Sequence, residues 1–522
     1  MGHTSIVVAL LLAVLGGLAL LLAWGQRWSS RRRRVALYAL VLCAGLAHTH
    51  SLTRDSVEGP VGWTQPAVHL HELVHYFLGS KYYAELGYAP LYEAIVIADY
   101  EDERPQFRMR NRFRDLRTNR VDRVRGEVIQ EGSIAKQRFS PERWEAFKAD
   151  VGLLRSGFVS QPAWHRSAIV RDHGYNGSPL TTLLLGTLAN QPFVSSVTFV
   201  QTIRWLDLLL FGLVAVAAAA RLGSSAALCF AVLWLANPFN DYGYIGGSFL
   251  RYNFALALLL AWFCLDRGRL KSAGLWLAVA AHLRIFPALF AAGLLLHDLA
   301  RPGRAARRQA LRRHAPLYAS FAASGAAIAA ITAFTPAPPE HNVWQDFLGR
   351  ISVHARALAS NAVGIDSALA YSREQSESAR REAFAEGESV PWEDLVSANL
   401  EERKTARTLA TLLLLAATCL CARRLPERYA LFLGFPLLFS LMYSSHYYYL
   451  SLGMLGLLFH DHRAALLTLT GGFGAAALLA TPTGFDDEVL RFAWVSVATA
   501  ASLIALGWVA TRPATPPWTD TR

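Results

Sequence analysis

Long apolar stretches alternate along the 522-residue chain with short connections, and every second connection carries a cluster of arginines. Because lipid offers no hydrogen-bond partners to the backbone, a stretch that crosses a membrane must form a helix. Arginine and lysine concentrate in the cytoplasmic connections of membrane proteins. The basic runs at residues 31–34, 301–313 and 423–424 therefore belong on one, cytoplasmic side. The pattern predicts an all-α, polytopic membrane protein with about 13 transmembrane helices.

Composition favours a membrane protein over a nucleic-acid-binding one. Charged residues make up 17% of the chain, whereas soluble domains carry about 25%. The formal net charge is +12, but most arginines stand at the ends of apolar stretches. That placement is typical of cytoplasmic anchoring, so we expect membrane lipid and no nucleic acid as a partner. The five cysteines lie within or beside apolar stretches and form no Cys-x-x-Cys pair, so no disulfide framework is expected.

Stretch lengths and flanking charges divide the chain into five regions. Residues 1–52 hold two N-terminal transmembrane helices, and residues 53–190 form an extracytoplasmic helical segment after the second span. Residues 191–336 form a transmembrane core, residues 337–404 a second extracytoplasmic segment, and residues 405–522 the C-terminal transmembrane helices. Most side chains capable of chemistry lie in the first extracytoplasmic segment.

One candidate site is the sequence His71-Glu72-Leu73-Val74-His75. On a helix, two histidines four residues apart share one face and can bind zinc, with the glutamate as general base for a bound water. A third ligand is needed, and Glu85 and Glu93 are the nearest acidic candidates. A membrane zinc metallohydrolase that uses His71 and His75 as ligands is therefore one alternative.

A second interpretation takes the whole stretch from Glu72 to Tyr92. It resembles the first outer loop of the GT-C superfamily, the membrane glycosyltransferases that use polyprenyl-phosphate sugars, and most closely the bacterial polyprenyl-phosphate-mannose-dependent mannosyltransferases. The family pattern is an acid, then a tyrosine, then a glycine followed by Leu-Tyr. Here these positions are Glu72, Tyr76 and the segment from Gly87 to Tyr92. The family usually has aspartate at the acid position, and Glu72 departs from that pattern.

Two later segments are similar to further parts of the same family. The segment His282 to Leu289 places Arg284 before a proline within an apolar stretch, as the family does in a mid-chain span. The segment Leu441 to Tyr447 contains His446 in a Ser-x-x-His-like pattern at an outer membrane face. The resemblance thus covers scattered parts of about 400 residues, in the family's order, with all three parts on the outer side.

The resemblance implies a GT-C-like fold and transfer of a sugar from a polyprenyl phosphate to an extracytoplasmic acceptor, with Glu72 as general base. The chemistry fits independently, since glycosyl transfer needs a carboxylate to take the acceptor proton and cations to stabilise the leaving phosphate. Arg284 has strongly apolar residues on both sides. A charged residue in such a membrane-spanning stretch is energetically costly unless it lines a site or pairs with an acid. The substrate-binding candidates are His75, Tyr76, Tyr92, Arg251, Arg284 and His446.

Several of these residues have a second, purely structural interpretation. Arg251 can simply extend its charged end to the membrane surface, and His446 can bond to neighbouring backbone. The segment Asp172 to Pro179 is either a capped helix start or, by the resemblance, a shaped substrate entrance. Tyrosines near the outer face belong either to an interfacial aromatic belt or to a sugar-stacking surface. They are Tyr242, Tyr244, Tyr252 and Tyr447 to Tyr449.

The expected location is a bacterial inner or plasma membrane, with the active site on the extracytoplasmic side. The expected donor is a lipid-linked sugar, and the acceptor is an unidentified glycan, lipid or protein of the cell envelope. No cofactor is certain, and a requirement for a divalent metal is left open. A transporter or flippase is the non-enzymatic alternative. Transporters commonly show internal repeats and charges at mid-membrane depth, whereas this sequence has few acids within its apolar stretches and no evident repeat.

Overall fold

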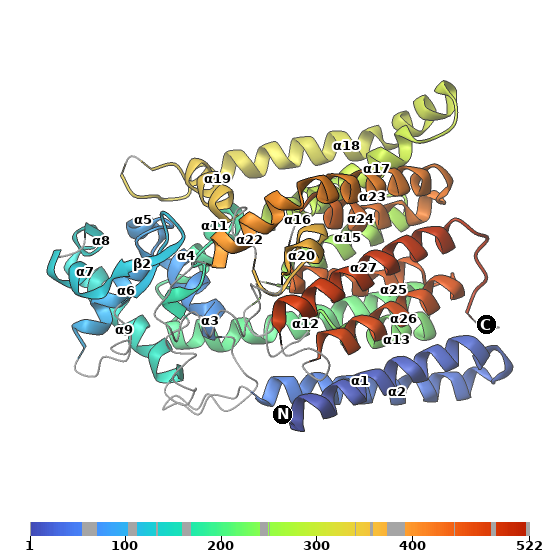
Figure 1. Cartoon of the computed structure of the whole chain (residues 1–522), viewed down its shortest axis with the longest axis horizontal. Helices are drawn as coiled ribbons and strands as arrows, with labels where there is room; N and C mark the ends of the chain where they lie inside the picture. The colour runs from blue at the N-terminus through green and yellow to red at the C-terminus, as the bar shows by residue number, and fades with distance from the viewer. Residues whose placement is uncertain are drawn as a thin grey trace.

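The computed structural model describes most of the 522-residue chain. The described residues are 2–54, 70–102, 112–131, 134–158, 169–240, 249, 251–339, 341–354, 359–372, 392–442, 444–481 and 487–517. They form a bundle of apolar helices with a polar region at one end (Figure 1). The prediction of a mostly helical protein is confirmed. Two short antiparallel strand pairs, β1–β2 and β3–β4, are exceptions to the all-α expectation.

The bundle consists of long helices that lie side by side, together with shorter apolar ones (Figure 1). Its α-helices are α1 (Gly2–Trp24), α2 (Ser30–Arg54), α11 (Pro179–Ala189), α12 (Ser196–Leu222), α13 (Ser224–Leu235), α15 (Asn253–Asp266), α16 (Leu270–Leu283), α17 (Ala288–Leu299), α18 (Arg304–Thr332), α23 (Lys404–Arg424), α24 (Gly434–Leu441), α25 (Leu455–Leu458), α26 (Arg463–Ala480) and α27 (Glu488–Ala510). A 3₁₀ turn, η1 (Gly25–Arg27), follows α1.

Six helices among the described residues are long and apolar enough to cross a membrane, as an integral membrane protein requires. They are Val7–Arg27, α12, α18, α23, α26 and α27. The predicted count of about 13 spans is not confirmed, because α11, α13, α15, α16 and α17 have only 10–17 residues. At 1.5 Å per residue, such helices are shorter than a 30 Å hydrocarbon layer.

Local sequence explains several helix ends. The side chain of Ser195 accepts a hydrogen bond from Thr198 N and caps α12, and Asp487 caps α27 in the same way. The helix α12 ends at Gly223, whose φ of 90° is a conformation that favours glycine. Arg284 and Pro287 flank the break between α16 and α17, because proline cannot continue a helix from the preceding turn.

Part of the predicted C-terminal transmembrane region is not α-helical. The segments η6 (Glu427–Leu433) and η7 (His446–Met454) are 3₁₀ helices, and β4 (Ser444–Ser445) pairs with β3 (Ala362–Val363). Irregular backbone is tolerated at membrane depth only where protein surrounds it. Most of η6 and η7 is buried accordingly. Near η6, a Cβ on Gly293 would lie 2.9 Å from Gly434 N. Glycine at position 293 therefore allows α17 and the start of α24 to approach this closely.

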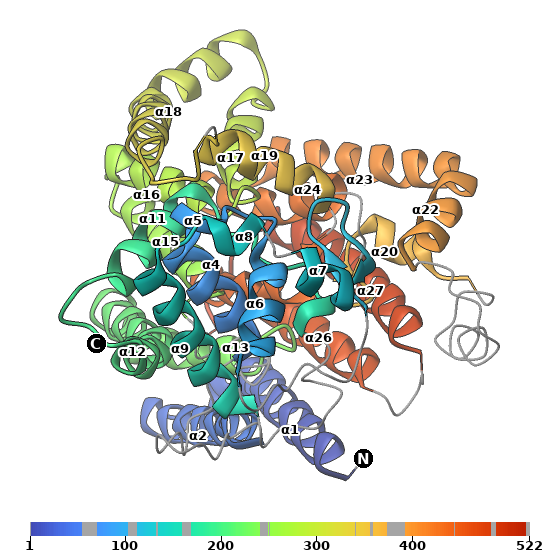
Figure 2. The same cartoon turned by 90° about the vertical axis from the view of Figure 1, so that its left-hand side faces the viewer.

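The outer region comprises the described residues between 70 and 178 together with α19, and it has its own hydrophobic core. Figure 2 shows this region in front of the bundle. Its elements are α3 (Leu70–Leu73), the π-helix η2 (Val74–Leu78), α4 (Gly79–Lys81), α5 (Tyr83–Leu86), α6 (Leu91–Tyr100), β1 (Arg112–Asp115), β2 (Arg120–Val124), α7 (Arg125–Glu131), α8 (Ile134–Gln137), α9 (Pro141–Phe158), η4 (Ile169–Arg171) and α19 (Val343–His354). The second polar segment adds α20 (Ile365–Ala370) and α22 (Trp392–Glu402).

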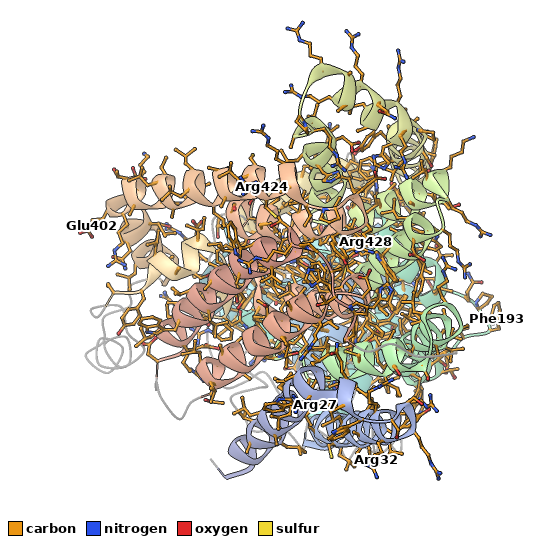
Figure 3. All side chains as sticks on the ribbon, turned by 90° about the vertical axis from the view of Figure 1, so that its right-hand side faces the viewer. Arg27, Arg32, Phe193, Glu402, Arg424 and Arg428 are labelled. Atoms are coloured by element: carbon orange, nitrogen blue, oxygen red, sulfur yellow. The ribbon has the colours of Figure 1, made fainter. Side chains whose placement is uncertain are left out.

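The predicted basic connections lie at the other end of the bundle. The connections between α1 and α2 and between α17 and α18 are at the right-hand end of Figure 1. Figure 3 faces this end and labels Arg27, Arg32, Arg424 and Arg428. The outer region and the arginine clusters therefore occupy opposite ends of the apolar bundle, which is the arrangement expected of a membrane protein with one cationic face.

Candidate functional site

A buried ion pair joins the outer region to the bundle. Glu72 lies on α3, and Arg251 lies two residues before the start of α15; each is 5% exposed. Arg251 Nη2 donates a hydrogen bond to Glu72 Oε1. The two residues are 179 positions apart. A buried charge is costly unless it is paired, so this contact fixes the acid and the guanidinium relative to each other.

Aromatic rings form the wall behind Arg251. The guanidinium carbon lies 3.5 Å from the centroid of the Tyr447 ring and 6.0 Å from that of Tyr448. A cation over an aromatic face is stabilised by the ring quadrupole, and more strongly where water is excluded. Both tyrosines are in η7, immediately after His446. The 3₁₀ segment of the bundle thus supplies part of the site's lining.

A second arginine lies in the same group of side chains. Arg284 Nη1 donates to the Tyr76 hydroxyl at 2.9 Å, and that hydroxyl donates to the side-chain oxygen of Asn176. The Arg284 guanidinium carbon also lies 5.7 Å from the Tyr448 ring centroid, so Tyr448 adjoins both arginines. These side chains together form the outer cluster: Glu72, Tyr76, Asn176, Arg251, Arg284, Tyr447 and Tyr448.

The local backbone that carries Glu72 and Tyr76 is unusual. Helix α3 continues into a π-helical turn at Val74–Leu78, and the Ser80 hydroxyl donates to Tyr76 O at 2.5 Å. Gly79 follows, and a Cβ there would lie 2.5 Å from the Tyr175 ring. Single π-turns are frequent at functional sites because they re-aim side chains within a helix. The bare glycine lets Tyr175 pack against the turn, next to Tyr76.

His75 and Tyr92 pack between the outer cluster and the rest of the outer region. His75 Nε2 and the Tyr92 hydroxyl are 2.7 Å apart, and His75 Nδ1 is 3.5 Å from an Asp172 carboxylate oxygen. Burial, and next the Asp172 charge, raise the pKa of Tyr92 well above its usual value, so its hydroxyl stays protonated. These contacts fix the 169–172 segment against α6. Their predicted role in binding substrate stays a prediction.

His446 lies beside the outer cluster. Its backbone N–H donates to Asn361 O at 3.0 Å, next to the β3–β4 pairing. Its ring centroid is 5.7 Å from that of Tyr447 and 5.1 Å from that of Phe492. The imidazole therefore packs against the tyrosine that covers Arg251. Its predicted contact with a donor phosphate stays a prediction.

Sequence reasoning missed the role of the late tyrosines. It assigned Tyr447 to Tyr449 chiefly to an interfacial belt, but Tyr449 is fully buried and Tyr447 packs on Arg251. Tyr252 is also buried and donates to Asn240. Tyr242 and Tyr244 lie outside the described residues. A signal was present, since three consecutive tyrosines directly follow the predicted His446 motif.

The alternative zinc site receives no support from the described side chains. Glu72 is paired with Arg251, and His75 is bonded to Tyr92. Among the side chains that the structure describes, no three histidine, cysteine, aspartate or glutamate residues lie close enough together to hold a metal ion. The side chain of His71 is outside that set, and so the prediction for His71 is not tested.

Comparison of the chain with protein-family models, with curated proteins and with solved structures finds no match.

Proposed function

We propose that this protein is an integral-membrane, inverting glycosyltransferase of GT-C type. It transfers one sugar from a polyprenyl-phosphate donor to a hydroxyl of an extracytoplasmic glycan, lipid or protein. The observation that carries the proposal is the outer cluster itself. One carboxylate, Glu72, and two guanidiniums, Arg251 and Arg284, come from three distant parts of the chain and meet where the apolar bundle joins the polar region.

The groups present match the demands of the reaction. The acceptor oxygen forms a bond to the anomeric carbon, and the bond from that carbon to the phosphate oxygen breaks. The acceptor proton passes to Glu72 as general base. The bond electrons leave with the polyprenyl phosphate, whose charge is stabilised by Arg251 and Arg284. The proton and the charge are thus received by groups already fixed in a water-poor setting.

The ion pair between Arg251 and Glu72 gives this reaction a natural order. A carboxylate that is paired with a guanidinium is a weak base, because its charge is already stabilised. A bound donor phosphate competes for Arg251, since arginine recognises phosphate as readily as carboxylate. Donor binding then releases Glu72 to accept a proton from the acceptor. The tyrosine wall keeps Arg251 in place while it changes partner.

The arrangement of the bundle supports an extracytoplasmic site. The arginine-rich connections gather at the end opposite the outer region, and such connections face the cytoplasm in membrane proteins. The outer cluster then faces the periplasm or cell exterior. A lipid-linked donor reaches that level from the outer leaflet of a bacterial inner or plasma membrane.

The test is Glu72→Gln in the full-length protein, assayed in membranes with a polyprenyl-phosphate sugar. The amide keeps the size and the ability to accept a hydrogen bond from Arg251, but it cannot take a proton. We expect transfer to fall by about 1,000-fold, within the range for loss of a general base, while the protein level holds.

The matched control is Glu93→Gln. Glu93 is also buried and paired with an arginine, with Glu93 Oε1 2.7 Å from Arg117 Nη1, but it lies on α6 within the outer region. We expect this variant to keep its transfer rate per folded protein. Unchanged transfer by the Glu72→Gln variant would remove Glu72 from the mechanism, and equal losses in both variants would point to a structural effect.

A further inference from the structure

Asp207 is a fully buried acid on α12, one of the helices long enough to cross a membrane. An ionisable residue in such a helix is expensive and is usually kept for a specific partner. One of its partners is a backbone group: the Phe249 N–H donates to Asp207 Oδ2 at 3.2 Å. Phe249 is two residues before Arg251 in the chain.

The backbone at Phe249 is strained. Its φ of 57° is left-handed, and Phe249 is one of only two non-glycine residues with positive φ among the described residues. In this conformation the Cβ comes too close to the following carbonyl oxygen. Such a conformation persists only where the surroundings impose it. The hydrogen bond to Asp207 is a direct means of imposing it.

The residue on the other side of Arg251 is held as well. The Tyr252 hydroxyl donates to Asn240 Oδ1, and Asn240 Nδ2 donates to Trp234 O at 2.9 Å. Trp234 belongs to α13. Phe249 is therefore fixed to α12, and Tyr252 is fixed through Asn240 to α13. Arg251 lies between these two anchors.

We propose that Asp207 is a positioning residue for the transfer reaction. It holds the backbone of Phe249 so that the Arg251 side chain reaches Glu72 and lies on the Tyr447 ring. The inference rests on the proposed function and adds a residue that never touches the reacting groups. An arginine side chain has many rotamers, and fixing its backbone in advance lowers the entropy that is lost when the guanidinium is held against the leaving phosphate in the transition state.

The experiment compares Asp207→Asn and Asp207→Leu in the full-length protein in membranes. The asparagine oxygen can accept the same N–H, whereas leucine cannot. We expect Asp207→Leu to lower kcat by about 100-fold, the effect of misplacing a catalytic group by about 1 Å, with a smaller change in KM. We expect Asp207→Asn to stay within about threefold of the natural protein, because a retained hydrogen bond keeps most of its free energy.

A double-mutant cycle separates positioning from general damage. In an Arg251→Gln background, Asp207→Leu should cost less than about twofold, because residues that act through one another are not additive. The control is Asp298→Asn on α17. Asp298 is equally buried, and it accepts bonds from His314 and Tyr318 at the opposite end of the bundle. Its effect on kcat should be small and additive with Arg251→Gln.

Hydrogen exchange gives a readout that does not depend on transfer. In the Asp207→Leu protein, amides of peptides that contain residues 249–254 should exchange at least about tenfold faster, since a lost hydrogen bond of about 1.4 kcal/mol opens the segment tenfold more often. Asp298→Asn should leave these peptides unchanged. The inference would be overturned if Asp207→Leu had a normal kcat or unchanged exchange, or if its effect were additive with that of Arg251→Gln. It would also be overturned if Asp207→Asn were as impaired as Asp207→Leu. A natural protein that transfers no sugar would overturn the proposed function and leave the exchange result to decide the role of Asp207.

Discussion

Two polar clusters, each built around a buried acid, lie at opposite ends of the same apolar bundle, and they are built in different ways. The outer cluster joins three distant segments, with partners up to 208 residues apart. The basic-end cluster consists of Asp298, His314, Tyr318 and Glu427. Three of its members are within 20 residues of one another in the chain, on neighbouring helices α17 and α18.

The balance of charge differs as well. In the basic-end cluster, Asp298 receives bonds from His314 and Tyr318 at 2.8 Å each, and His314 also lies 3.2 Å from Glu427. In this cluster the hydrogen-bond donors and the carboxylate acceptors are paired. In the outer cluster, two guanidiniums face one carboxylate between tyrosine rings. An excess of cation in a buried setting suits an anionic ligand, whereas a balanced network suits a structural joint.

The largest expected effect comes from removing the excess charge. Arg284→Gln keeps a side-chain amide that can donate to the Tyr76 hydroxyl but removes the cation. Transfer should fall by about 1,000-fold, or about 4 kcal/mol, as for the loss of a donor that stabilises a developing anion. Steady-state kinetics on purified protein measures this. The control is Arg313→Gln at the basic end, where the side chain is largely exposed and pairs with Glu427; its rate should not change. A normal rate in Arg284→Gln would mean that the outer cluster is only a joint.

The converse effect is expected at the basic end. His314→Leu removes the imidazole that lies 2.8 Å from the buried Asp298 carboxylate. Removing one partner of a buried ion pair costs about 3 kcal/mol, so the thermal unfolding midpoint in detergent should fall clearly. Transfer per folded protein should be normal at a temperature where the variant is folded. A selective loss of transfer with normal stability would contradict the division between the two clusters.

The sequence predicted which segments face the same side, because arginine clusters fix the orientation of each span. That argument places Glu72, Arg284 and His446 at one end of the molecule, where the structure brings Glu72 and Arg284 into one cluster. The orientation of the spans does not predict which helices lie next to one another within the bundle. The pairing of Arg251 with Glu72 depends on how helices pack, and no local pattern encodes a contact across 179 residues.

Three other features could not be predicted from the sequence, for different reasons. The 3₁₀ segments η6 and η7 are short and mostly buried, and a buried segment of this kind shows no period that identifies its helix type. Asp207 is followed by a long apolar run in α12, and its hydrogen bond to the Phe249 backbone became evident only from the structure. The tyrosines of η7 looked like membrane-interface residues because such belts have the same composition.

A smaller effect is expected from the aromatic wall of the outer cluster. Tyr447→Phe keeps the ring face that covers Arg251, whereas Tyr447→Leu removes it. A desolvated cation–π contact is worth about 1–2 kcal/mol, so Tyr447→Leu should lower transfer about tenfold and Tyr447→Phe only slightly. Equal losses in both variants would assign the effect to the hydroxyl. The basic-end cluster offers a comparison, since Tyr318 acts there through its hydroxyl at 2.8 Å from Asp298, and Tyr318→Phe should destabilise the protein without affecting transfer.

The smallest expected effect concerns how the stability of the protein depends on pH at the two ends of the bundle. His314 lies between two carboxylates, whereas His354 on α19 lies near His173 and Arg350. Burial, and next the Arg350 charge, hold the pKa of His354 well below its usual value. The unfolded state therefore binds more protons at low pH, and the stability that depends on neutral His354 is complete above about pH 6.5 and is lost as the pH falls below it. Replacing His354 with glutamine should flatten this loss, by at most about 1.4 kcal/mol at pH 5.5. Unfolding midpoints of the natural protein and the His354→Gln variant at pH 7.5 and 5.5 measure the effect. If the two proteins lose the same stability between these pH values, other groups cause the acid sensitivity of the outer region.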